Sequence, residues 1–211
     1  MKILKILTAL LLGFALPRVF AEDYNIKYST NYLMPAYVHF KENGKTYSVS
    51  ASINVPLYKI KFSANGTQSS TQFSMLNYQD SRNSKPYAKV SVQGKLIEYG
   101  KIKDGLKTES LNTPIFDLFS MAFQLSYYDQ LPLNFQTTNG KKLYPANNVI
   151  LNKSEKTIKT EIGEVQEITY KFRMENKDFM VKKYQHEKFP RYISYSRDGD
   201  NYELEFDSFV Q

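Results

Sequence analysis

Residues 47–55 read Tyr-Ser-Val-Ser-Ala-Ser-Ile-Asn-Val, with an apolar side chain at every odd position and a polar one at every even position. Successive side chains of a β-strand point to opposite faces of the sheet, so this alternation predicts a strand with one buried face. The same rhythm recurs in shorter segments at 24–28, 36–40, 58–62, 88–92, 168–172 and 202–206. We therefore expect a mostly β protein.

Turn-forming pairs separate these segments: Asn43-Gly44, Asn65-Gly66, Gln93-Gly94, Asn139-Gly140, Ile162-Gly163 and Asp198-Gly199. Short strands joined by such turns are typical of an antiparallel meander. A twisted sheet of about ten or more strands is expected to curl into a barrel or half-barrel. The polar runs 77–85 and 101–112 are predicted to be loops.

One segment, Pro114 to Tyr127, has the period of a helix. Its apolar residues at i, i+3, i+4, i+7 and i+8 are Ile115, Leu118, Phe119, Ala122 and Phe123. Thr113 is a suitable N-cap for this helix, and Pro114 suits its first position. We expect this single amphipathic helix to close the open end or the concave side of the sheet, because its apolar stripe needs a partner.

The first 21 residues resemble a secretory signal peptide. A cationic start that includes Lys2 and Lys5 is followed by a mostly apolar run from Ile6 to Leu16, and Val19-Phe20-Ala21 fits a cleavage site. The alternative, a transmembrane anchor, would need about 20 apolar residues, and Pro17-Arg18 ends the run well before that. The sequence thus predicts export, cleavage after Ala21 and a single β-rich domain over residues 22–211 without a transmembrane segment.

Composition narrows the classes of function. The chain has no cysteine, so disulfides, thiol nucleophiles and cysteine-bound metals are excluded. Three of its 28 basic side chains lie in the leader, which leaves a mild excess of 25 over 21 acidic ones. Basic pairs such as Lys141-Lys142 and Lys182-Lys183 are too sparse for a nucleic-acid-binding surface, and the predicted export also argues against one. The 17 tyrosines and 14 phenylalanines suit a sheet and an apolar interior.

Catalytic patterns are missing from the sequence. The two histidines, His39 and His186, stand in no metal-binding spacing, and no G-x-S-x-G or phosphate-binding glycine motif occurs. Glu203, Glu205 and Asp207 alternate with apolar residues, as on the outer face of a half-buried strand. We expect no catalytic residues, no metal and no cofactor, and we expect the protein not to be an enzyme.

Two features remain as candidates for binding. Asp117, Ser120 and Gln124 form a polar stripe at i, i+3 and i+7 of the predicted helix. This stripe is either a ligand-binding element or simply the solvated face of the helix. The abundant aromatic side chains either line an interior suited to lipidic ligands or only fill the core.

The chain resembles the family of uncharacterised Gram-negative envelope proteins catalogued as domain of unknown function thirty-one-zero-eight. The shared features are an aromatic first strand at 24–28, the D-x-x-S helix core at 117–120 followed by Gln124-Leu125, the T-x-x-G strand entry at 160–163 and the ending at 189–193. The chain departs from the family pattern at 73–76, where Phe-Ser-Met-Leu replaces a glycine, leucine and proline group. The resemblance implies a periplasmic, barrel-like β fold, and no activity.

Together these observations predict a non-enzymatic periplasmic protein that binds an apolar or amphiphilic component of the cell envelope, such as a lipid. The alternative is an envelope assembly or structural factor that binds a protein partner through an exposed sheet edge.

Overall fold

The computed structural model describes residues 21–161, 163–175, 177–197 and 200–211, and the predicted signal peptide lies outside them except for Ala21. Most of these residues belong to one sheet of thirteen strands, in the order β12-β13-β14-β15-β16-β1-β2-β3-β4-β5-β6-β7-β8. Its first eight strands are β1 (Glu22–Thr30), β2 (Ala36–Glu42), β3 (Thr46–Val55), β4 (Tyr58–Gln68), β5 (Phe73–Arg82), β6 (Lys85–Gln93), β7 (Leu96–Lys101) and β8 (Lys107–Ser110). The other five are β12 (Asn152–Thr160), β13 (Gly163–Met174), β14 (Lys177–Tyr184), β15 (Tyr192–Arg197) and β16 (Asp200–Phe209).

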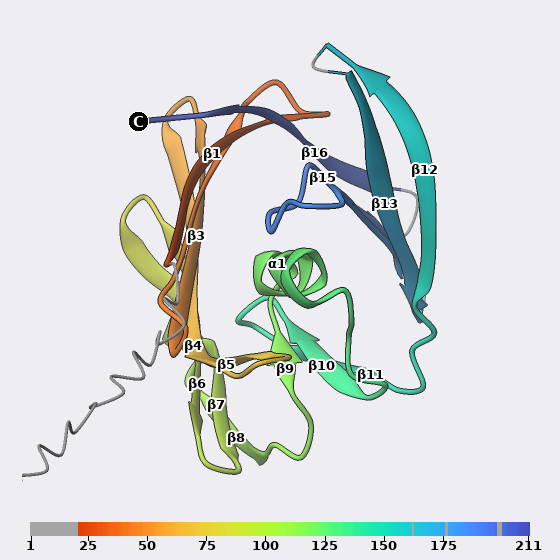
Figure 1. Ribbon diagram of the computed structural model, residues 1–211. Helices are drawn as coiled ribbons and strands as arrows, with labels where there is room; N and C mark the ends of the chain where they lie inside the picture. The colour runs from red at the N-terminus through yellow and green to blue at the C-terminus, as the bar shows by residue number, and fades with distance from the viewer. Residues whose placement is uncertain (1–20, 162, 176, 198–199) are drawn as a thin grey trace, which may run out of the picture.

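All neighbouring strands of this sheet are antiparallel, which confirms the predicted meander. The first and last strands are adjacent, because β1 pairs with β16 from Ile26 opposite Phe209 to Thr30 opposite Leu204. The two edges of the sheet are β8 and β12. The sheet curls into an open half-barrel, with β1–β8 on one side and β12–β16 on the other (Figure 1).

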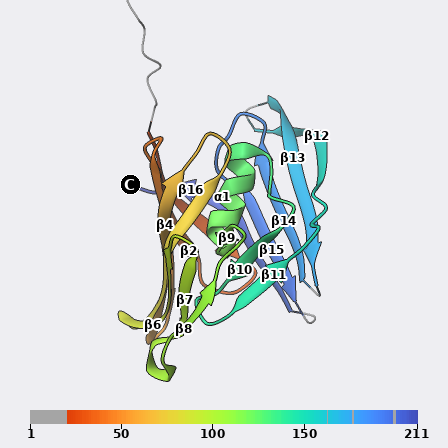
Figure 2. The same ribbon diagram turned by 90° about the horizontal axis from the view of Figure 1, so that it is seen from below.

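A helix and a small second sheet occupy the inside of the half-barrel. The helix α1 (Leu118–Tyr128) lies between the two halves of the large sheet (Figure 2). The second sheet consists of β9 (Ile115–Phe116), β10 (Phe135–Thr138) and β11 (Leu143–Ala146). It lies in the gap between the β8 and β12 edges, and a 3-10 turn, η1 (Ile102–Asp104), precedes β8 (Figure 1).

The predicted helix lies on the concave side of the sheet, as expected, but its predicted start was wrong. Its N-cap is Asp117, whose extended backbone precedes Leu118, and Thr113 does not cap it. Ile115 and Phe116 instead form β9, which pairs in parallel with Gln136 and Thr137 of β10. The apolar pattern continues from β9 into α1 because both elements are buried, so the sequence pattern did not show where the helix begins.

Both polar runs that were predicted to be loops contain strands. Residues 77–85 belong to β5 and β6, joined by a tight turn at Asn83-Ser84, where both residues have positive φ. Residues 101–112 contain η1 and β8. These segments are polar because one face of β5 and all of β8 are exposed to solvent, which polarity alone does not distinguish from a loop.

The strand at 47–55 behaves as its alternation predicts over most of its length. Tyr47, Val49 and Ala51 are buried, whereas Ile53 is only half-buried and Val55 is exposed. The apolar face of β3 therefore passes from a packed core into an open region at the C-terminal end of the strand.

Candidate functional site

The three predicted site residues lie on the helix, and all three are buried. The carboxylate of Asp117 accepts hydrogen bonds from the backbone N–H groups of Phe119 at 2.9 Å and Ser120 at 3.3 Å, and from the Ser120 hydroxyl. The Tyr47 hydroxyl donates to Ser120 Oγ at 3.4 Å. Burial raises the pKa of Asp117, although these hydrogen bonds oppose the shift. The interpretation of this stripe as a solvated face is wrong.

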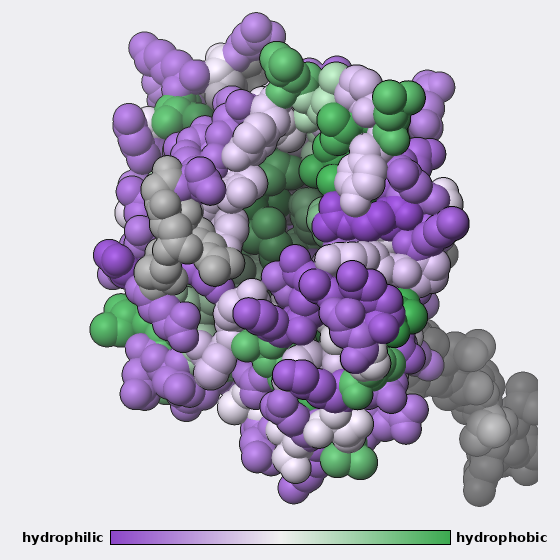
Figure 3. Space-filling view, turned by 180° about the vertical axis from the view of Figure 1, so that it is seen from behind, coloured by the Kyte–Doolittle hydropathy of each residue, from purple (hydrophilic) through white to green (hydrophobic). Residues whose placement is uncertain are grey.

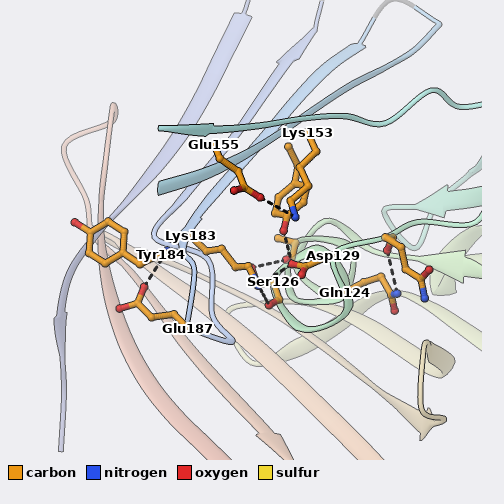
Figure 4. Close-up of polar contacts among 11 residues, drawn as sticks. Gln124, Ser126, Asp129, Lys153, Glu155, Lys183, Tyr184 and Glu187 are labelled. Atoms are coloured by element: carbon orange, nitrogen blue, oxygen red, sulfur yellow. Dashed lines mark hydrogen bonds and ion pairs between the residues drawn. The ribbon is translucent and has the colours of Figure 1, made fainter. Parts of the chain in front are cut away.

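Gln124 joins the helix to the rest of the chain through backbone groups. Its Oε1 accepts from the Phe73 N–H at 2.8 Å, and its Nε2 donates to the carbonyl oxygens of Thr71 and Gln130, both at 3.1 Å. Both polar atoms of this side chain, labelled in Figure 4, are therefore engaged within the protein. Gln124 thus serves as an anchor between α1 and the chain around the start of β5.

The C-terminal end of the helix is fixed by a buried lysine. Lys183 on β14 donates to the Ser126 carbonyl oxygen at 2.7 Å and pairs with Asp129 Oδ1 at 2.8 Å (Figure 4). The Tyr170 hydroxyl also donates to Asp129. Burial alone would raise the pKa of Asp129, but these hydrogen bonds outweigh it and hold that pKa below its usual value. A cation at the carbonyl end of a helix also matches the helix dipole.

Aromatic rings pack tightly around the same part of the helix. Phe123 stacks on Phe40 with ring centroids 4.1 Å apart, and Phe40 contacts Phe73 edge-on at 5.7 Å. The Tyr127 hydroxyl donates to the buried Glu42 at 2.6 Å. We call this region, from Phe123 to Asp129 with its partners, the closed end of the interior.

The N-terminal end of the helix faces an open cavity of about 730 Å³. Its walls are almost entirely apolar and come from β1, the β1–β2 turn, β3, β4, α1, β15 and β16. They include Leu33, Met34, Ile53, Val55, Phe62, Leu118, Phe119, Tyr195 and Leu204. Figure 3 shows this hollow, with hydrophobic atoms on its floor and others on its rim. We call it the open cavity.

A smaller chamber of about 230 Å³ adjoins the open cavity. The two share Phe62, Leu118, Phe119 and Tyr195 as walls, and the smaller one continues between α1 and the small sheet. Its lining includes Asp117, Thr137, Thr138 and Asn139. Of the three predicted site residues, only Asp117 therefore reaches this space.

Sequence reasoning missed most of the cavity wall, although two signals pointed to it. The turn after β1 reads Asn31-Tyr32-Leu33-Met34-Pro35, which is unusually apolar for a surface turn. The apolar face of β3 also continues through Ile53 and Val55 beyond its buried part. Tyr195 and Tyr202 gave no signal of their own, because the sequence does not show that their strands line the same cavity as β3.

The other polar candidates lie at the surface. His39 and His186 are exposed, and His39 Nε2 lies 2.8 Å from the carboxylate of Asp23. Glu205 and Asp207 are exposed on the outer face of β16, and Asp207 pairs with Lys27 at 2.5 Å. Among the residues that the structure describes, no group of three or more His, Cys, Asp or Glu side chains is placed to hold a metal ion.

Comparisons with known proteins give no family for this chain. No model of a protein family matches it, and neither a curated protein nor a solved structure does. The resemblance to the uncharacterised envelope family therefore stays a prediction. In the described part of the chain, no helix is long and apolar enough to cross a membrane.

Proposed function

We propose that this protein binds an apolar or amphiphilic molecule, such as a lipid of the cell envelope, in the open cavity, and that it does so without catalysis. The observation that carries this proposal is the cavity itself, about 730 Å³ of apolar-walled space that opens to the surface. Ligand sites for small molecules are concave, mostly apolar and of this size. The predicted signal peptide would place this binding protein in the periplasm.

The polar groups at the mouth are suited to an apolar ligand because they are already satisfied. Asn31 donates to the Asn201 carbonyl oxygen at 2.6 Å and accepts from the Glu203 N–H at 3.0 Å. A hydrocarbon chain can therefore pass Asn31 without leaving these polar groups unpaired. We expect an acyl chain or a similar hydrocarbon to fill the cavity, with any polar group of the ligand at the mouth.

The alternative, partner binding through a sheet edge, has less support. The edge strand β12 carries Lys153, Glu155, Lys156 and Lys159, and β8 has only four residues, including Lys107 and Glu109. Charged side chains and short length are features that protect an edge against pairing with another strand. The edges of this sheet therefore favour solubility over strand addition.

The direct test is to look for the ligand. The purified protein is extracted with organic solvent, and the extract is analysed by mass spectrometry. We expect a lipid or another apolar molecule in stoichiometric amount, and the protein stripped of it is expected to bind a dansyl-labelled fatty acid. Absence of both the extracted molecule and the binding would contradict the proposal.

Leu118 offers a matched pair of variants because it lines both parts of the cavity at the first position of α1. Leu118→Gln places an amide in the wall while keeping a good helix former, and Leu118→Met keeps the wall apolar. Burial of an unpaired amide under the ligand costs about 1–3 kcal/mol, so Leu118→Gln should weaken fatty-acid binding about tenfold or more. Leu118→Met should bind like the parent; unchanged binding in Leu118→Gln would mean that the cavity is not the site.

A further inference from the structure

The open cavity opens at one end of the half-barrel, where several hairpin turns meet. The chain reverses direction at every turn of an antiparallel meander, so alternate turns lie at the same end. The β1–β2, β3–β4 and β5–β6 turns are therefore all at the end where the cavity opens. The β3–β4 and β5–β6 turns are in direct contact, because the Asn83 N–H donates to the Lys59 carbonyl oxygen at 2.8 Å. We call residues 31–35, 55–59 and 82–85 the mouth face.

Apolar side chains project from the mouth face into solvent. Leu33 and Leu57 are both fully exposed, at 99% and 101% of the reference area, and Tyr32 is half-exposed. Leu57 also has a positive φ of 64°, a conformation that favours glycine or asparagine in a turn. A leucine that is exposed and unfavourable for the local backbone contributes nothing to the folded chain that glycine would not. Its side chain is therefore free to make an apolar contact outside the protein.

The mouth face is also basic. Lys59 and Lys85 are exposed and lie in the two touching turns beside Leu57, and Asp80 in β5 is buried and ion-paired with Arg82 at 2.8 Å. Two acidic groups at this end, Asp200 and Glu203, lie on β16, on the other side of the cavity mouth. The turns at the opposite end carry charges of both signs, among them Lys45, Lys95, Glu161 and Glu187. Two fully exposed leucines therefore lie beside two exposed lysines at the cavity mouth, whereas at the opposite end Lys95 lies beside Leu96, which is 55% exposed.

We propose that the mouth face docks on the surface of an anionic phospholipid bilayer. Leu33 and Leu57 enter the interfacial region, and Lys59 and Lys85 lie at the phosphate groups, as on other interfacial membrane-binding surfaces. Docking in this orientation brings the cavity mouth against the lipid, so an apolar molecule passes between bilayer and cavity without crossing water. This transfer of a ligand rests on the proposed function, whereas the docking itself does not.

The test is co-sedimentation of the purified protein with vesicles of phosphatidylcholine alone and of phosphatidylcholine with phosphatidylglycerol. We expect binding to the anionic vesicles, weakened by added salt because charges separated by more than a Debye length are screened. Leu33→Ser combined with Leu57→Ser should lower the affinity about tenfold or more, since each leucine loses its apolar contact with the interface. Lys59→Gln combined with Lys85→Gln should lower it by roughly 25-fold, at about fivefold per lysine.

Matched controls come from the opposite end of the molecule. Leu96→Ser removes an exposed leucine at the β6–β7 turn, and Lys45→Gln with Lys95→Gln removes the same charge as the mouth-face pair. Both controls should bind vesicles like the parent, and all variants should carry the same N-terminus, checked by mass spectrometry. Equal losses in the controls, or no binding of the parent to anionic vesicles, would overturn the proposal.

Two further outcomes separate this inference from others. Light scattering could show that the parent protein is a dimer and that the Leu33→Ser/Leu57→Ser variant is a monomer. This result would mean that a second copy covers the mouth face, and it would overturn docking on lipid. A parent that binds the dansyl-labelled fatty acid but no vesicle would contradict docking alone, and one that binds vesicles but no fatty acid would contradict only the proposed cavity ligand.

Discussion

The two ends of the same helix differ in how the sheet surrounds them. At the closed end, Phe123 stacks on Phe40, and Lys183 ties the Ser126 carbonyl group and Asp129 to β14. At the other end, Leu118 and Phe119 face about 730 Å³ of open space. One helix thus serves as a fixed core element and as a cavity wall. We expect substitutions at the closed end to lower the stability of the fold, and substitutions at the open end to weaken ligand binding.

The largest effect should come from Leu125→Gln at the closed end. Leu125 is fully buried, so the change removes apolar contacts and also buries an amide without a partner. Together these should lower the free energy of unfolding by about 3–5 kcal/mol, the size of large core substitutions. Chemical denaturation of the variant measures this loss. A value below about 1 kcal/mol would mean that the closed end is not a packed core.

Asp129→Asn should have the next largest effect. Asparagine fits the left-handed backbone of Asp129, but it leaves the Lys183 ammonium group buried without a counter-charge. We expect a loss of about 2 kcal/mol in unfolding free energy, less than for a fully buried pair because Asp129 is half-exposed. Asp178→Asn, which removes the same charge from an exposed ion pair with Arg173, is the control and should stay within about 0.5 kcal/mol of the parent.

The same pair predicts a dependence of stability on pH. The pKa of Asp129 is lower in the folded protein than its ordinary value of 3.8, so its ionised form stabilises the fold. This contribution is present above the ordinary pKa and is lost as the pH falls through the lower, folded value. Asp117, whose pKa is raised, acts in the opposite direction and is unchanged in the variant. On acidification, the parent should therefore lose more stability than Asp129→Asn; equal losses would contradict the assigned role.

A smaller effect is expected for Ser120→Ala, which removes the hydroxyl that donates to Asp117. One such hydrogen bond contributes about 1 kcal/mol or somewhat more when its acceptor is charged. The control is Ser48→Ala on the exposed face of β3, which should be close to neutral. A neutral Ser120→Ala would mean that this hydrogen bond does not stabilise the fold.

The smallest effect on stability is expected for Leu118→Gln at the open end. Leu118 is only partly buried and its outer side faces the cavity, so the new amide is reached by water in the empty protein. We expect a change within about 1 kcal/mol, well below that of the same substitution at Leu125. Thermal melting of the two variants side by side measures the contrast, and similar losses at both positions would remove the distinction between the ends.

The sequence was sufficient for the fold class because the strand pattern is local. The alternation at 47–55 and the turns at Asn43-Gly44 and Gln93-Gly94 depend on neighbouring residues, and the structure confirms them. The pair Asn65-Gly66 was wrongly predicted to be a turn. Gly66 lies within β4, where an added Cβ would meet the Ser74 carbonyl oxygen at 1.9 Å, so glycine is needed there for close approach of two strands.

The site was harder to predict because its walls come from strands that are distant in sequence. The polar spacing of Asp117, Ser120 and Gln124 was visible, but their burial depends on strands of the two sheets that pack around the helix. That Tyr195, Leu204 and Ile53 line one cavity depends on the curl of the thirteen-stranded sheet. A period in the sequence shows which face is apolar; it does not show how much space the opposite wall leaves.

The pairing of β1 with β16 has a consequence for how this chain reaches its native state. The two strands meet near the middle of the sheet, although they are the first and last of the described fold. Contacts between residues so far apart in sequence give a high contact order, and such topologies fold slowly. A growing chain can assemble β2–β8 as successive hairpins, but the two halves cannot be joined until the last strand has emerged. Loss of the final ten residues would therefore leave two unjoined sheet edges, both exposed to aggregation.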